Sequence, residues 1–202
     1  MVARLPQNLR SDARDNRTRI IDAARNAFAT GNLDVPLREI ARHASVGPAT
    51  LYRHFSSKES LIAEAFDDQM RICYSIVDRG LTEPDPWIGF SSVLEQLCEV
   101  HARDQGFSAA FMAAFPNARD FAAERDQAFK SLVLLISRAK EAGRLRPEVV
   151  LDDVILILMA NIGIQATSVT ARVAASRRFA AIALQGLQPF PGTSPLPPMS
   201  PL

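Results

Sequence analysis

Residues 35–66 read VPLREIARHASVGPATLYRHFSSKESLIAEAF, and this stretch decides the fold of the N-terminal part of the chain. Its apolar residues recur three and four positions apart, which is the period of an α-helix. The period predicts two short helices, at about 36–44 and 48–55, each with a proline in its first turn. A tight turn at residues 45–47 joins them. Two short helices joined in this way indicate a helix-turn-helix, whose second helix lies in the major groove of DNA.

The second of these helices carries polar side chains next to apolar ones. Leu51 and Phe55, four positions apart, are expected to pack inward, which turns the polar side chains outward. Hydroxyl and imidazole groups suit phosphate oxygens, and arginine also reads guanine. The candidate contacts on and around this helix are Arg38, Thr50, Tyr52, Arg53, His54 and Lys58.

Three of these residues have an alternative interpretation. Tyr52 also suits a half-buried packing position, and His54 suits the cap of a helix. Arg53 also suits a solvated charge or a phosphate contact in place of a base contact.

The remainder of the chain keeps the helical period, interrupted by clusters of Gly, Pro and Asn. Alternation with a period of two is absent over strand length, and there is no βαβ rhythm. We therefore expect an all-α fold of about nine helices. Their expected positions are about 15–30, 36–44, 48–55, 56–79, 87–104, 106–115, 118–142, 148–167 and 172–187. The fourth is expected to begin at Ser56-Ser57-Lys58-Glu59, a capping-box pattern.

Composition indicates a globular protein with a local basic region. The 202 residues are 48% hydrophobic and 22% charged, which excludes a wholly disordered, collagen-like or disulfide-scaffold chain. The formal net charge is only +1, yet residues 1–55 carry nine arginines against five acidic residues. A basic front end on a mildly acidic body favours contact with a polyanion, with a chance fluctuation as the alternative.

Several function classes are excluded by missing signals. The two cysteines, Cys73 and Cys98, lie outside any CxxC and fit a reducing cytosol. The first residues lack the apolar core of a signal peptide, and no run of eighteen apolar residues occurs. GxSxG, HExxH, GxGxxG and P-loop patterns are absent, and the three histidines lack metal-ligand spacing. We expect a cytoplasmic protein that is not an enzyme and has no cofactor, metal or membrane partner.

Residues 15–66 resemble the DNA-binding domain of the tetracycline-repressor (TetR) family of bacterial transcriptional regulators. The shared patterns are I-I-x-A-A-x-x-x-F in the first helix, I-A-x-x-A before the turn and T-L-Y-x-H-F-x-x-K-E-x-L after it. Carried over position by position, the resemblance implies base contacts for Arg38 and Arg53, groove-facing positions for Ala49 and Thr50, and phosphate contacts for Tyr52, His54 and Lys58.

One residue of the turn departs from the family pattern. The family often has Gly where this chain has Ser45. If this residue adopts a positive φ, Ser costs about 1 kcal/mol relative to Gly.

The resemblance also implies a domain organisation and a mechanism. A flexible arm (1–14) precedes a helix-turn-helix domain (15–60) and a ligand-binding and dimerisation domain (61–188). A Pro-rich tail (189–202) is expected to be disordered. A homodimer would bind a palindromic DNA operator and be released by a small-molecule effector, expected to be apolar or amphipathic. The apolar stretch 149–164 supports the dimer.

The residues of the implied ligand site are aromatic or sulfur-bearing side chains and polar residues within apolar runs. The candidates are Phe66, Met70, Phe90, His101, Phe111, Phe129, Asn161 and Gln165. Plain core packing is the alternative for the apolar members. Pairing with one another or across a dimer is the alternative for the polar ones. At the level of function, a ligand-independent DNA-binding or protein-binding member of the same fold, or an activator, stays open.

Overall fold

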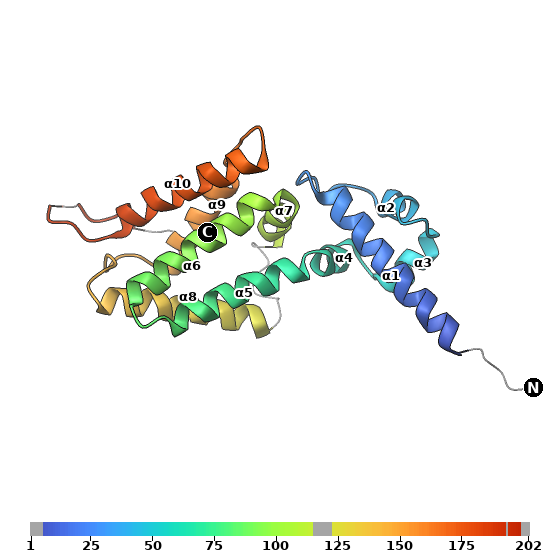
Figure 1. The fold of residues 1–202 in the computed structure, drawn as a ribbon, viewed down its shortest axis with the longest axis horizontal. Coiled ribbons are helices and arrows are strands. Elements are labelled where there is room, and N and C mark those ends of the chain that lie inside the picture. The colour runs from blue at the N-terminus through green and yellow to red at the C-terminus, as the bar shows by residue number, and fades with distance from the viewer. Residues whose placement is uncertain (1–5, 115–122, 193, 199–202) are drawn as a thin grey trace, which may run out of the picture. The chain divides into compact units, whose positions relative to one another are not determined.

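The computed structural model describes residues 6–114, 123–192 and 194–198, and its regular structure in these ranges is entirely helical (Figure 1). The expected all-α fold is confirmed. The helices are α1 (Pro6–Phe28), α2 (Leu37–His43), α3 (Pro48–His54), α4 (Lys58–Ala65), α5 (Asp67–Thr82), α6 (Pro86–Arg103), α7 (Gln105–Ala114), α8 (Ala123–Glu141), α9 (Leu151–Ile162) and α10 (Val169–Leu187).

The described chain divides into two compact units. The N-terminal unit comprises the residues up to Asp68 together with residues 105–110. The C-terminal unit comprises residues 69–104 and the chain from Phe111 onward. The domain boundaries at residues 60 and 188 stay predictions.

The N-terminal unit is organised around α1, which contacts α2, α3 and α4 (Figure 1). Ile20, Ala24 and Phe28 lie along one face of α1, at the four-residue spacing of a helix, and all three are fully buried. They pack in a core with Ile40 of α2 and Leu51 of α3, which are also fully buried. Helix α1 begins at Pro6 and not at the expected residue 15, so the expected flexible arm overlaps its first turns.

The expected helix over residues 56–79 is interrupted, and this prediction is wrong. Helix α4 ends at Ala65, Phe66 has a non-helical backbone, and α5 begins at Asp67. The Phe66 ring is buried in the N-terminal unit, 6.4 Å from the ring of Phe28 and 6.2 Å from that of Phe107. The ring contacts of Phe66 coincide with the break between α4 and α5. The helical spacing of apolar residues in the sequence continues across this break and therefore does not reveal it.

Four arginine side chains donate hydrogen bonds to carbonyl groups at the C-terminal ends of helices that are distant from them in the sequence. The last carbonyl groups of a helix have no partner within it, and positive charge is favourable there. The pairs are Arg17 with the His54 carbonyl of α3, Arg25 with the Ala65 carbonyl of α4, Arg138 with the carbonyls of Leu81 and Glu83 at the end of α5, and Arg172 with the Ala102 carbonyl of α6. Each pair ties the end of one helix to another helix.

The C-terminal unit is organised around α6, which contacts α8, α9 and α10. Two glycines set the close approach of α5 and α6. A Cβ on Gly89 would lie 2.6 Å from the carbonyl oxygen of Gly80, and a Cβ on Gly80 would lie 2.2 Å from Val93 Cγ2. Only hydrogen fits at these two positions. Helix α9 is shorter than the expected 148–167, since it begins at Leu151 and ends at Ile162.

The chain after α10 returns to the C-terminal unit. The guanidinium of buried Arg146 donates a hydrogen bond to the Ser194 carbonyl and lies 3.3 Å from Glu148. The Arg146 backbone N–H also donates to the carbonyl of Leu187 at 3.0 Å. The Pro-rich tail, expected to be disordered, therefore has a defined contact at residue 194. Over the described ranges, no helix combines the length and the apolar character needed to cross a membrane.

Candidate nucleic-acid interface and ligand cavity

The turn between α2 and α3 has the geometry of a Schellman motif. The Val46 N–H donates to the Ala41 carbonyl at 3.0 Å, and the Ser45 N–H donates to the Arg42 carbonyl at 3.1 Å. Ser45 has φ +54°, so it occupies the left-handed position that usually takes Gly. Helix α8 ends with the same pair of bonds, and there the left-handed residue is Gly143 with φ +66°.

Helix α3 presents a polar face outward and an apolar face inward. Leu51 and Phe55 are buried, as expected from their spacing. Tyr52 is 58% exposed and Arg53 is also exposed. This exposure argues against the alternative that Tyr52 is a half-buried packing residue. The structure thus leaves an aromatic hydroxyl and a guanidinium on the surface of the second helix of the motif.

The other predicted DNA contacts lie around these two. Arg38 on α2 and Ala49 in the first turn of α3 are exposed, and Thr50 is half-buried. Lys58 is half-buried and is the first residue of α4. These residues therefore lie on α2, on α3 and at the start of α4, while their contacts with DNA stay predictions.

The start of α4 is capped, but by different residues than expected. Ser57 is the N-cap, since its Oγ accepts from the Ser60 N–H at 3.1 Å and Ser60 Oγ accepts from the Ser57 N–H at 3.2 Å. The expected pattern began one residue earlier and ended on Glu59. This reciprocal pair fixes the backbone next to Lys58.

One ring nitrogen of His54 is buried. Its Nε2 is enclosed by protein and has no hydrogen-bond partner within the described part of the chain. Desolvation by burial, followed by the charges of Arg53 and Arg17, lowers the pKa of the His54 ring. The phosphate contact expected of His54 stays a prediction, and such a contact uses the other nitrogen, Nδ1.

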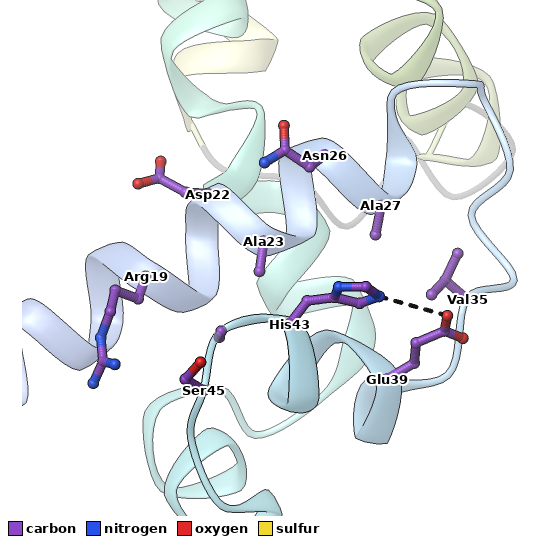
Figure 2. Close-up of a pocket in the computed structure, with 10 residues that line it drawn as sticks. Arg19, Asp22, Ala23, Asn26, Ala27, Val35, Glu39, His43 and Ser45 are labelled. Atoms are coloured by element: carbon purple, nitrogen blue, oxygen red, sulfur yellow. Dashed lines mark ion pairs between the residues drawn. The ribbon is translucent and has the colours of Figure 1, made fainter.

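A groove of about 510 Å³ lies in the N-terminal unit between α1 and the segment from Val35 to Ser45 (Figure 2). Figure 2 shows Glu39 and His43 of α2 in an ion pair, with His43 Nε2 3.7 Å from Glu39 Oε1. Of the residues predicted for either site, none of the described ones lines this groove. Its polar lining comes from Arg19, Asp22, Asn26, Glu39, His43 and Ser45.

The C-terminal unit holds a separate, smaller cavity of about 50 Å³. Met70, His101, Phe111 and Phe129, four of the eight predicted ligand residues, line it. They lie on α5, α6, α7 and α8 and are joined there by residues of α9, among them Leu158. The structure thus assembles half of the predicted set from helices that are distant in sequence.

The described residues of the cavity wall are uncharged at neutral pH. His101 is 3% exposed, and its ring meets the Phe111 ring edge-on with the centroids 4.8 Å apart. Burial lowers the pKa of His101 to about 4 and raises the pKa of the Cys73 thiol to about 12. None of the described residues that line the cavity is Asp, Glu, Lys or Arg.

The other four predicted ligand residues lie outside the cavity. Phe66 belongs to the core of the N-terminal unit, and Phe90 is buried beside Trp87 with ring centroids 6.0 Å apart. Gln165 follows the end of α9 and is exposed, so it does not share that helix with Asn161. Spacing of four in the sequence therefore did not place the two amides on one surface.

Asn161 has a structural role within the unit. It is 1% exposed, its Nδ2 donates to the Cys98 carbonyl at 2.9 Å, and its Oδ1 accepts from Ser176 Oγ at 2.7 Å. These bonds join α6, α9 and α10. The amide is satisfied within its own chain, by partners other than Gln165.

Two cavity residues outside the eight candidates above carried a usable signal, and Tyr74 is the one that sequence reasoning missed. Cys73 and Tyr74 lie on α5 next to Met70 and line the same cavity. Their spacing of three and four from Met70 places all three on one face of a helix.

Two family models match this chain. Residues 20–65 match the tetR family of bacterial regulatory proteins, and residues 85–189 match the SbtR-like transcriptional regulator C-terminal domain. The HTH-type transcriptional regulator UidR of Escherichia coli K12 is 41% identical over 66 residues, which cover 32% of this chain and 34% of UidR. The HTH-type transcriptional repressor KstR of Rhodococcus jostii is 33% identical over 133 residues, or 62% of this chain and 60% of KstR.

One similar solved structure is the TetR transcriptional regulator SCO0520 from Streptomyces coelicolor. It has 26% sequence identity and a TM-score of 0.53, and the match covers 86% of this chain and 98% of SCO0520. The chain therefore matches only part of the length of UidR and KstR, but nearly the whole of this structure.

Proposed function

Because the chain belongs to the tetR family of bacterial regulatory proteins and is a DNA-binding transcriptional regulator, we propose that it acts as a ligand-responsive repressor. In this proposal a homodimer binds a palindromic operator, and a small effector releases it. The observation that carries the proposal is the helix-turn-helix, whose second helix buries Leu51 and Phe55 and exposes Tyr52 and Arg53. The repressor KstR, similar over 133 residues, supports the sign of regulation.

On the DNA side, we assign base contacts to Arg38 and Arg53 and phosphate contacts to Tyr52 and Lys58. Arg53 suits guanine because a guanidinium donates two parallel hydrogen bonds to O6 and N7. Two copies of α3 would enter successive major grooves about 34–36 Å apart, which requires a two-fold symmetric site.

On the ligand side, the cavity between α5, α6, α7, α8 and α9 is the proposed effector site. The described part of its wall is uncharged and favours a neutral, apolar or amphipathic effector, because an unpaired charge is costly to bury. The cavity of about 50 Å³ is smaller than the roughly 150 Å³ cavity that holds benzene, so effector binding would have to displace side chains. The small volume also favours a second candidate, a regulator that binds DNA without an effector.

The test is binding to DNA that flanks the gene of this protein, by mobility shift and footprinting at two salt concentrations. Wild type is compared with Tyr52→Ala and Arg53→Ala. We expect protection of a two-fold symmetric site, weakened in both variants and by salt, since phosphate contacts release counterions. Binding that is independent of sequence, both there and in a selection from genomic fragments, would exclude operator recognition.

The effector is tested separately with a panel of small neutral aromatic and aliphatic compounds. A ligand that binds the folded state raises the melting temperature. A rise together with release of the bound DNA supports the repressor proposal. DNA binding that no compound of the panel weakens would support the second candidate.

A further inference from the structure

Arg17 of α1 contacts both α3 and α4. Its Nε donates to Glu64 Oε1 at 2.7 Å, and its Nη2 donates to Glu64 Oε2. Its Nη1 donates to the His54 carbonyl at 3.3 Å, and its guanidinium carbon lies 4.8 Å from the centroid of the Phe55 ring. We call these four residues the Arg17 cluster. One side chain thus joins the first helix of the N-terminal unit to the last residue of α3 and to α4.

The geometry of the Arg17 cluster fixes an orientation. A guanidinium bound by both oxygens of a carboxylate is held in one plane, because its donors form a rigid fork. Glu64 lies on α4 between Leu61 and Ala65, two fully buried residues. The plane of the guanidinium is therefore set by the core of the unit. The remaining donor, Nη1, is then directed at the end of α3.

The Coulomb energy of the Arg17–Glu64 pair is a small part of its effect. The two side chains are 40% and 35% exposed, so solvent screens the charges. The pair instead fixes the orientation of the Arg17 guanidinium toward the end of α3. This orientation matters because Tyr52 and Arg53 are the residues next to the end of α3.

We propose that Arg17 is a positioning residue for operator binding, which fixes the end of α3 against α1 and α4 and holds Tyr52 and Arg53 in the orientation that the operator requires. Arg17 acts through these residues and does not itself contact DNA. The inference rests on the proposed operator recognition and adds a residue to it.

The decisive variant is Glu64→Gln, because charge and geometry predict opposite results for it. Removal of a negative charge makes the N-terminal unit more positive, which on electrostatic grounds strengthens DNA binding. Loss of the bidentate pair releases the guanidinium, so we expect operator affinity to fall about tenfold. Affinity for a scrambled duplex of the same length and composition stays equal or rises. The ratio of the two affinities is the quantity that changes.

Asp22→Asn is the matched control. It removes the same charge from α1 at an exposed side chain outside the Arg17 cluster. We expect its ratio of operator to scrambled affinity to equal that of wild type. The operator probe is a duplex that wild type selects from random sequences.

Arg17→Lys is the second variant. Lysine keeps the charge but lacks the planar fork. We expect weaker operator binding with unchanged affinity for the scrambled duplex. Wild-type operator affinity in either Arg17→Lys or Glu64→Gln would overturn the proposal.

Amide hydrogen exchange in the free protein provides a readout that needs no operator. We expect faster exchange over residues 48–55 in Glu64→Gln than in Asp22→Asn, with α6 unchanged as an internal reference for folding. Equal exchange over residues 48–55 in the two variants would overturn the proposal. If wild type selects no sequence, operator recognition fails, whereas the exchange comparison still decides whether Arg17 fixes α3.

Discussion

At the residue scale, the turn of the helix-turn-helix contains a backbone conformation that is unfavourable for its residue. Ser45 has φ +54° in a Schellman motif, and Gly143 occupies the same position after α8. A left-handed conformation is strained for a residue with a Cβ and free of that strain for glycine. The DNA-binding unit therefore contains a small, removable strain.

We predict that Ser45→Gly increases the free energy of unfolding by up to about 1 kcal/mol, with the greater flexibility of glycine in the unfolded chain offsetting part of the gain. The reverse substitution, Gly143→Ser, is the control and should destabilise by a similar amount. A Cβ at Gly143 would have no neighbour within 4 Å, so this substitution adds backbone strain without steric crowding. Urea unfolding measures both. Destabilisation by Ser45→Gly would contradict the claim that the backbone of Ser45 is strained.

His101 makes stability depend on pH. Its pKa is about 4 in the folded protein and 6.5 in the unfolded chain, because burial disfavours the charged ring. Between these values the unfolded chain binds a proton that the folded protein does not. We predict that stability falls as pH falls from 6.5 to 4, by up to about 3 kcal/mol from this residue. Denaturant unfolding at a series of pH values measures it, and His101→Gln should flatten the profile. An unchanged profile in the variant would assign the dependence to other groups.

At the element scale, the helix-turn-helix was predictable because its signals are local. Pro36 and Pro48 open α2 and α3 near the expected residues, and the spacing of Leu51 and Phe55 gave the buried face of α3. The interruption at Phe66 was not predictable, because it accompanies ring contacts with Phe28 and Phe107, which are distant in the sequence.

The same limit applies to the charges and to the cavity. Arg17 and Arg25 contribute to the basic front end of the sequence, yet the structure pairs them with Glu64 and Asp68. Only half of the predicted ligand residues line the cavity, because residue type alone does not distinguish a cavity wall from the core. Asn161 shows this most clearly, because its amide is bound by Cys98 and Ser176 of other helices.

The approach of α5 to α6 depends on glycine. A Cβ at Gly89 would lie 2.6 Å from a backbone oxygen, which cannot move aside as a flexible side chain can. We predict that Gly89→Ala destabilises by about 2 kcal/mol through overpacking. Gly186→Ala in α10 is the control, because a Cβ there has no neighbour within 4 Å, and alanine favours a helix by about 0.5–1 kcal/mol. Thermal unfolding of the two variants should therefore shift in opposite directions. A Gly89→Ala protein as stable as wild type would show that the helices separate at little cost.

At the scale of the whole molecule, the proposed homodimer needs an apolar surface. Ile182 of α10 is 59% exposed in the single chain, and Leu156 of α9 and Val169 of α10 are also exposed. Exposed apolar side chains on adjacent helices are typical of a protein interface. Ile88 of α6 is equally apolar and 51% exposed, which provides a comparison of the same residue type.

We predict that Ile182→Asp shifts the protein from dimer to monomer in sedimentation, because a charge buried in an interface lacks a partner. Ile88→Asp, which places the same charge on α6, should sediment as wild type does. The opposite pattern, with only Ile88→Asp monomeric, would place the interface on another surface. Operator affinity should fall when the dimer is lost, because two linked DNA-binding units bind two half-sites more tightly than one unit binds one.

The packing of Trp87 against Phe90 has a practical consequence for spectroscopy. Trp87 is the single tryptophan of the chain, and it lies in the C-terminal unit. Tryptophan fluorescence therefore reports on the unfolding of that unit alone, whereas far-ultraviolet circular dichroism reports on the helix content of both units. Coincident denaturation curves from the two signals would show that the units unfold together, and separate curves would give each unit its own stability. The chain carries its own optical label on the unit that contains the ligand cavity.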